Sequence, residues 1–194
     1  MTAPNPPSAP TVVVVSGNPR PGSRTLGAAE AAARRIATVL GIDDVATIDL
    51  ATFAAEILAP EHPAADAAKE RLAGATVAVI ATPVYKAAYT GLLKSFLDLY
   101  GNDGLAGVVA VPLVVSGSPA HALAGEVHLR PVLVELGAVV PARSLTVTEA
   151  QLADLDPVID AWLDRASEPL RRAASPAVVL AGAGATALVE EVVR

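Results

Sequence analysis

The sequence contains no cysteine, and aromatic residues make up only 3% of its 194 residues. Without cysteine there can be no disulfide framework, no thiolate nucleophile and no metal site with sulfur ligands. Basic residues are also outnumbered, with 14 Lys and Arg against 20 Asp and Glu, and they form no stripe along the chain. A net charge of −6 without a basic stripe argues against nucleic acid as the partner.

The sequence also lacks the segments that direct a chain to a membrane or anchor it there. Residues 1–10 contain four prolines but neither a basic region nor an apolar core, so they do not have the pattern of a secretory signal. The longest apolar run, residues 105–115, is interrupted by Gly and Pro and is too short to span a bilayer. We therefore expect a soluble, cytoplasmic protein without a membrane partner, with residues 1–10 as a flexible leader.

Apolar residues are abundant instead, at 53% of the chain, and many of them are Ala and Val. A chain of this length and composition is long enough for one domain with a substantial hydrophobic core but too short for two such domains. We predict one domain over residues 11–172. The remaining residues, 173–194, are rich in Ala, Val and Gly and are expected to form a helical C-terminal extension.

Short apolar runs alternate with amphipathic segments along the domain. The apolar runs predict buried strands over residues 11–15, 45–50, 76–80, 108–115 and 138–146. Helical spacing of apolar residues predicts helices over residues 25–40, 66–73, 92–100, 120–136 and 151–172, with Pro131 as a kink or break and Trp162 in the core. This alternation predicts an α/β fold, a flavodoxin-like doubly wound five-stranded parallel sheet of order 2-1-3-4-5.

A polar loop, SGNPRPGSRT, follows the first predicted strand and ends at a helix N-terminus. Backbone N–H groups and the helix dipole favour an anion at such a place, and Arg20 and Arg24 would add charged hydrogen bonds to a phosphate. The spacing of Gly17 and Gly22 is that of the start of a P-loop. Ser23 occupies the position of the P-loop lysine, however, so hydrolysis of a nucleoside triphosphate is not expected.

Two further loops are predicted to meet the first one, because the carboxyl ends of parallel strands lie at one edge of a sheet. One follows Thr82 and carries Tyr85, Lys86 and Tyr89 ahead of an amphipathic helix. The other reads SGSPAH and ends at His121. Tyr85 and Lys86 either contact a ligand there or are ordinary surface residues, and His121 either contacts it or caps its helix.

The segments GNPRPGSRT, TPVYKAAYTGLLKSFLDLY, SGSPAHAL and LRPVLVELGA together resemble the NADPH-dependent FMN reductase family. The resemblance covers about residues 11–146 and is closest to the branch that supplies reduced flavin to alkanesulfonate monooxygenases. Asn18 stands where serine is usual in the family, and Ser118 stands where a second glycine is common. Residues 11–172 would accordingly form a domain that binds FMN and NAD(P)H.

The resemblance implies specific roles for thirteen positions. The FMN phosphate would be bound by Asn18, Arg20, Ser23 and Thr25. The flavin ring and ribityl chain would be lined on one side by Pro83, Val84, Tyr85 and Lys86. The other side of the ring would be bordered by Ser116, Gly117, Ser118 and His121. Tyr89 would be associated with a π-bulge in the following helix and with a subunit interface.

The activity implied by the resemblance is that of a flavin reductase. Hydride would pass from the nicotinamide of NADPH or NADH to flavin N5, with no catalytic side chain assigned, and reduced FMN would pass to a partner monooxygenase. A homodimer or homotetramer is expected from the family, and no metal is expected. Two alternatives remain open at this point: a quinone or azo reductase that retains its FMN, and a non-enzymatic flavin electron carrier.

Overall fold

The computed structural model describes residues 9–175 of the chain. The predicted leader, residues 1–10, lies outside the described residues except for its last two positions. Most of the predicted C-terminal extension, residues 173–194, also lies outside them, and its first two residues belong to the last helix of the domain.

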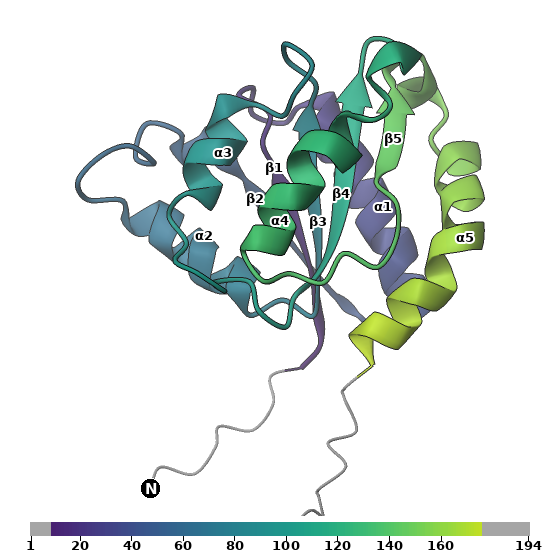
Figure 1. The fold of residues 1–194 in the computed structure, drawn as a ribbon, viewed down its shortest axis with the longest axis horizontal. Coiled ribbons are helices and arrows are strands. Elements are labelled where there is room, and N and C mark those ends of the chain that lie inside the picture. The colour runs from purple at the N-terminus through teal and green to yellow at the C-terminus, as the bar shows by residue number, and fades with distance from the viewer. Residues whose placement is uncertain (1–8, 176–194) are drawn as a thin grey trace, which may run out of the picture.

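Five parallel strands form one sheet in the order β2-β1-β3-β4-β5, which confirms the predicted fold class and strand order (Figure 1). The strands are β1 (Thr11–Ser16), β2 (Asp44–Asp49), β3 (Val77–Pro83), β4 (Val109–Ser116) and β5 (Leu145–Thr148). Every residue of β3 and β4 is buried, as expected for parallel strands covered on both faces.

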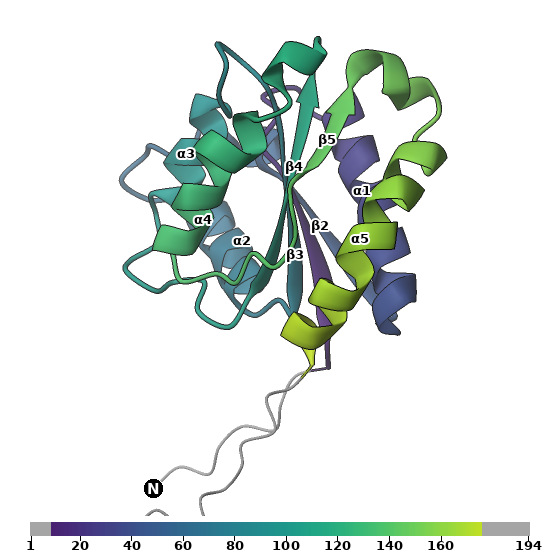
Figure 2. The ribbon, with the colours of Figure 1, turned by 45° about the vertical axis from the view of Figure 1, so that its right-hand side comes forward.

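Helices cover both faces of the sheet (Figures 1 and 2). One face packs against α1 (Arg24–Leu40) and α5 (Asp156–Ala174), and the other against α2 (Pro63–Ala73), α3 (Gly91–Leu97) and α4 (Arg130–Glu135). Successive residues of a strand point to opposite faces, so Val12 and Val14 join one cluster while Val13 and Val15 join the other. Among the residues described, no helix has the length and apolar character needed to cross a membrane.

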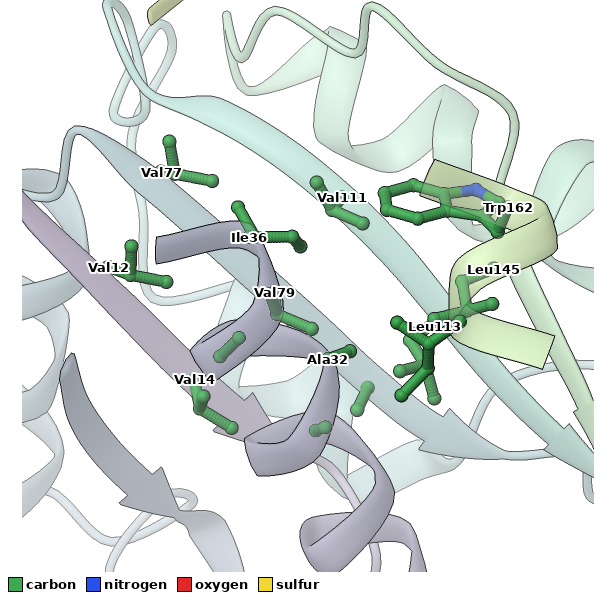
Figure 3. Close-up of a cluster of buried hydrophobic side chains, with 14 of the residues drawn as sticks. Val12, Val14, Ala32, Ile36, Val77, Val79, Val111, Leu113, Leu145 and Trp162 are labelled. Carbon is green, nitrogen blue, oxygen red and sulfur yellow. The ribbon is translucent and has the colours of Figure 1, made fainter. Parts of the chain in front are cut away.

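Trp162 lies in the core between α5 and the sheet, as predicted, with 7% of its surface exposed. Figure 3 shows its indole ring in the same cluster of buried side chains as Val111, Leu113 and Leu145. Indole Nε1 donates a 2.7 Å hydrogen bond to the carbonyl of Arg143, so its polar group is satisfied while the ring is buried.

The fifth predicted strand is present, but its predicted bounds, residues 138–146, are wrong, because the strand is Leu145–Thr148. Before it, Val139 forms only an isolated bridge with Val109. Pro141 then has no N–H to donate to a ladder. The guanidinium of Arg130 donates to the carbonyls of Val140 and Ala142, so these backbone groups are bonded to a side chain instead of a strand.

The segment predicted as one helix, residues 120–136, is three elements. It contains the 3₁₀-helix η2 (Pro119–His121), the π-helix η3 (Gly125–Leu129) and then α4. The predicted kink or break at Pro131 is instead a change of helix type, because η3 runs directly into α4 and the N–H of Arg130 bonds to the carbonyl of Gly125. Pro131, which has no N–H to donate, lies in the first turn of α4. The predicted helix over 151–172 likewise begins later, after the 3₁₀-helix η4 (Glu149–Ala153).

The remaining bounds shift by a few residues. β3 continues past the predicted end at residue 80 through Pro83, which pairs with Val115 of β4. Between the second strand and α2 lies the 3₁₀-helix η1 (Leu50–Phe53), and α2 begins at Pro63, three residues before its predicted start at residue 66. Proline is favoured in the first turn of a helix, where its missing N–H has no partner anyway.

Candidate functional site

The loops that follow β1, β3, β4 and β5 enclose a cavity of about 350 Å³ at the carboxyl edge of the sheet. This volume falls at the lower end of the range of small-molecule sites, about 300 to 1,000 Å³. The cavity is lined by Asn18, Arg20, Pro21, Gly22, Ser23, Arg24, Thr25, Pro83, Val84, Tyr85, Val115, Gly117, Glu149 and Leu152. All four residues of the predicted phosphate loop are among them.

The loop after β1 is held by its own side chains. Asn18 is buried, its Nδ2 donates to Oγ1 of Thr25 at 3.1 Å, and its Oδ1 accepts the N–H of Arg20 at 3.0 Å. Oγ of Ser23 caps α1 by accepting the N–H of Leu26 at 3.2 Å. Asparagine in place of the usual serine therefore makes two hydrogen bonds that shape the loop.

The first turn of α1 retains N–H groups for a ligand. The first N–H groups of an α-helix have no acceptor within the helix. Ser23 satisfies that of Leu26, which leaves the N–H groups of Arg24 and Thr25 at the wall of the cavity. Together with the helix dipole and the positive charge of Arg20, they give this end of the cavity the chemistry that suits an anion.

Asp49, at the end of β2, tethers the same loop and was not predicted. Its Oδ2 accepts the N–H of Gly22 at 2.9 Å, and its Oδ1 accepts the N–H of Ala51 at 3.3 Å. Gly22 has a φ of 62°, a left-handed conformation that glycine adopts without strain. The available signal was an acidic residue at the carboxyl end of a strand that neighbours β1 in the predicted order.

Thr90 joins the loop after β1 to the loop after β3, and no sequence pattern identified it. Its Oγ1 donates to the carbonyl of Gly17 at 2.5 Å and accepts the N–H of Leu93 at 3.2 Å. Its own N–H donates to Oγ1 of Thr82 at 3.1 Å. A Cβ on Gly17 would lie 2.6 Å from Cβ of Leu93, so only glycine allows α3 to approach this closely.

The loop after β3 is a tight two-residue hairpin. Tyr85 and Ala88 exchange backbone hydrogen bonds of 2.9 and 3.1 Å. The two central residues, Lys86 and Ala87, have φ values of 51° and 68°. This is the geometry of a type I′ turn, in which residues other than Gly, Asn and Asp are strained. The hairpin places Tyr85, 46% exposed, at the cavity wall with Pro83 and Val84, whereas Lys86 does not line the cavity.

The loop after β4 contributes less than predicted, because only Gly117 of its four predicted residues lines the cavity. Ser116 is buried and its hydroxyl donates to the carbonyl of Ser118 at 2.9 Å. Oγ of Ser118 accepts the N–H of Ala120 at 3.2 Å, and His121 is exposed at the end of η2. These side chains shape the loop, and their place beside a flavin stays a prediction.

The segment after β5 supplies the charged rim of the cavity. Glu149 lies 3.4 Å from the Arg24 guanidinium (Oε2 to Nη2), and Leu152 adds an apolar side chain. Sequence reasoning missed both residues because the fifth strand was predicted to end at 146. With the strand ending at Thr148, Glu149 follows it directly at the carboxyl edge.

Tyr89 lies in the loop just before α3 and is half-buried. The π-bulge predicted beside it is not found: α3 is α-helical from Gly91 to Leu97, and the π-helix of the described chain is Gly125–Leu129. The correction concerns the helix only, and a role of Tyr89 in subunit contact stays a prediction.

The two ends of the cavity differ in chemistry. One end combines the N-terminus of α1 with two arginines, and the other is formed by the apolar and aromatic side chains of Pro83, Val84, Tyr85, Val115 and Leu152. This donor set fits a ligand that carries a phosphate at one end and a flat ring at the other.

Comparison with known proteins gives a consistent result. The sequence model of the family described as NADPH-dependent FMN reductase matches residues 10–151. The chain is 37% identical to an FMN reductase (NADPH) of Escherichia coli over 147 residues, which covers 74% of this chain and 75% of the relative. It is 33% identical to the NADH-dependent FMN reductase SfnE of Pseudomonas putida, covering 89% of this chain and 92% of the relative.

Solved structures with the same fold include an apo form of the NADH:FMN oxidoreductase EMOB, at 33% identity and a TM-score of 0.64. That match covers 84% of this chain and 93% of the other. An azoreductase of Bacillus anthracis matches at 15% identity and a TM-score of 0.52, over 84% of this chain and 99% of the other. The second similarity is one of fold alone.

Proposed function

The chain belongs to the NADPH-dependent FMN reductase family, and on this basis we propose that it is an NAD(P)H:FMN oxidoreductase. The observation that carries the proposal is the cavity with an anion-binding end at α1 and an apolar end at the loop after β3. Both substrates carry phosphate and a flat ring, so the two ends together match their chemistry.

In the proposed complex, Arg20 and the N–H groups of Arg24 and Thr25 bind the phosphate of FMN. Asn18 and Ser23 hold the loop in the conformation that presents these donors. Fixing the phosphate at the end of α1 orients the rest of the molecule toward the other end of the cavity. Pro83, Val84 and Tyr85 then line the ring, and Gly117 allows the backbone after β4 to approach it closely.

Bound FMN supplies the hydride acceptor at its N5, and the nicotinamide supplies the hydride. The protein's part is to orient the two rings and exclude water between them. The N–H groups of Val84 and Tyr85 are already bonded to the carbonyls of Val115 and Ala88. The backbone donors that this hairpin offers to a flavin are therefore the N–H groups of Lys86 and Ala87, which have no acceptor within residues 9–175. No side chain is assigned as a proton donor.

The proposal extends to how the product is used. FMN binds and leaves as a substrate, and reduced FMN passes to a partner flavin-dependent monooxygenase. The enzyme works as a homodimer or homotetramer, with Tyr89 near the contact between subunits. The resemblance of TPVYKAAYTGLLKSFLDLY to the corresponding family segment supports these points.

The decisive experiment is an absorption spectrum of the purified protein followed by NADPH and NADH oxidation with and without added FMN. We expect colourless protein whose turnover requires added FMN. Yellow protein that reduces a quinone without added FMN would instead indicate a reductase that retains its flavin. Flavin binding without turnover of either nucleotide would indicate an electron carrier and contradict the proposed enzyme.

The subunit proposal has a separate test. Tyr89→Ala should change the molar mass in light scattering or slow the release of FMN. Tyr89→Phe serves as the matched variant, because it keeps the ring and removes only the hydroxyl. If neither variant changes the mass or the release of FMN, Tyr89 has no special role.

A further inference from the structure

We propose that Glu149 is a competing anion that holds Arg24 away from the FMN phosphate and so keeps the flavin exchangeable. This inference rests on the proposed function and assigns a new residue to it. Glu149 and Arg24 come from distant parts of the chain, the segment after β5 and the start of α1, yet both line the same cavity.

The geometry places a carboxylate where a phosphate is expected. Oε2 of Glu149 lies 3.4 Å from Nη2 of Arg24, and the two side chains are 56% and 69% exposed. Arg24 is the first residue of α1, and both residues line the cavity that this end of the helix borders. A ligand phosphate must either displace Glu149 from Arg24 or bind close to a like charge.

Glu149 is positioned without help from its own side chain. The N–H and Oγ1 of Thr148 both donate to Oε1 of Gln151, at 2.8 and 2.9 Å, and this capping box fixes the first turn of η4. Within residues 9–175, the partner of the Glu149 carboxylate is Arg24. Replacing the carboxylate by an amide should therefore leave the fold of this segment intact.

The other carboxylate near the phosphate loop has a different role. Both oxygens of Asp49 accept backbone N–H groups, from Gly22 and from Ala51, so Asp49 holds the loop in shape. Glu149 accepts no backbone hydrogen bond in the described chain and contacts a charged side chain at the wall of the cavity. The competition is therefore assigned to Glu149 alone.

The Arg24–Glu149 ion pair is weak enough to lower the affinity for FMN without preventing FMN from binding. Exposed ion pairs are weak, and a phosphate with nearly two negative charges competes successfully for an arginine. Glu149 thus lowers the affinity for FMN without preventing binding. Such an effect favours release of the flavin after it has been reduced.

The test is Glu149→Gln, with the dissociation constant and release rate of oxidised FMN measured by quenching of flavin fluorescence without nicotinamide. We expect FMN to bind about two- to fivefold more tightly and to leave more slowly, from the usual strength of an exposed pair. Riboflavin, which lacks the phosphate, should bind both proteins equally. The effect should shrink as salt is raised, because exposed charges are screened. Glu168→Gln, which breaks the exposed Arg172–Glu168 pair on α5, is the matched control.

A second variant separates competition for Arg24 from general repulsion. In an Arg24→Met background, Glu149→Gln should lose most of its effect on FMN. Unchanged FMN affinity in Glu149→Gln, an equal change for riboflavin, or a full effect in the Arg24→Met background would each overturn the inference. If Glu149→Gln leaves the FMN affinity unchanged but the wild-type enzyme is active, only this inference fails and the proposed function stands. A wild-type protein that neither binds FMN nor oxidises either nucleotide overturns both.

Discussion

The loop after β1 and the loop after β4 are both rich in small polar residues and both follow buried strands, but they are built differently. In the first, the side chain of Asn18 donates to that of Thr25, and the backbone N–H of Gly22 donates to the side chain of Asp49 at the end of β2. In the second, the hydroxyls of Ser116 and Ser118 bond to backbone within the same loop. The first loop leaves an arginine and helix N–H groups at the cavity, and the second leaves mainly Gly117.

The difference shows that residue type alone does not make a polar loop a binding site. A hydroxyl used to satisfy its own turn has little capacity left for a ligand. The loop after β1 leads directly into α1. The first turn of this helix has more backbone N–H groups than the side chains of the loop accept. In the loop after β4, a short 3₁₀-helix and a π-helix follow, and the first turn of η2 is capped by Ser118.

The largest effect on ligand binding is expected from Arg20→Ala in the loop after β1. The variant should weaken FMN binding by about 1.5 to 3 kcal/mol, the usual contribution of a hydrogen bond to a charged group. Titration calorimetry measures the change. Arg34→Ala, an exposed arginine further along α1, should bind FMN as the wild type does. If Arg20→Ala bound FMN as tightly as the wild type, the assignment of the phosphate to this loop would be wrong.

Gly17→Ala should destabilise the protein by about 1 to 3 kcal/mol, the usual cost of overpacking. Its Cβ would lie 2.6 Å from Cβ of Leu93, which cannot rotate away, so α3 has to move. Urea unfolding measures the change. Gly27→Ala in α1 is the matched control, because a Cβ there meets no atom within 4 Å and the substitution should stabilise the helix by up to about 1 kcal/mol. Equal stability of the two variants would show that the loops do not need this close approach.

Glu126 tests the stability of the segment beyond the loop after β4. Burial raises the pKa of this carboxyl, but hydrogen bonds from Ser144 and Arg130 more than compensate and hold its pKa below the ordinary value of 4.5. A lowered folded-state pKa adds stability above about pH 4.5, which is lost as the pH falls through the lower folded value. Glu126→Gln should therefore cost about 1 to 2 kcal/mol at pH 7 and progressively less below pH 4.5.

Thermal unfolding from pH 3 to pH 7 measures this difference. Glu135→Gln, an exposed glutamate on α4, is the control and should follow the wild type at every pH. A stability difference for Glu126→Gln that stays constant with pH would show that the loss is one of packing and not of charge.

The smallest effect is expected from the double variant Ser118→Ala/His121→Ala. Neither residue lines the cavity, so FMN affinity should change by less than about twofold if the loop keeps its conformation, because surface changes away from a site have small effects. The measurement is the same titration used for Arg20→Ala. A tenfold loss would show instead that the loop after β4 closes on the flavin, and would restore the role predicted for both residues.

Sequence patterns predicted the fold because it depends on alternation that is local in the chain. The β-branched run of β1 and the apolar spacing of α1 each specify an element, and parallel strands alternating with helices admit few topologies. The predicted bounds of the fifth strand were wrong because a side chain from another part of the chain is the hydrogen-bond partner of the backbone carbonyls there. Arg130 bonds the carbonyls of Val140 and Ala142, and no local pattern indicates that these residues leave the sheet.

The sequence alone was enough to predict the strand order, the polar loop that leads into α1 and the family. Each rests on the identity and spacing of neighbouring residues. Only the tertiary structure decided which side chains share the cavity and which are used within the fold. Thr90 meets Gly17, Asp49 meets Gly22, and Glu149 meets Arg24 across long stretches of chain. Such contacts depend on how the carboxyl ends of separate strands come together in the sheet. The spacing of residues along the chain does not show which side chains are close to one another there.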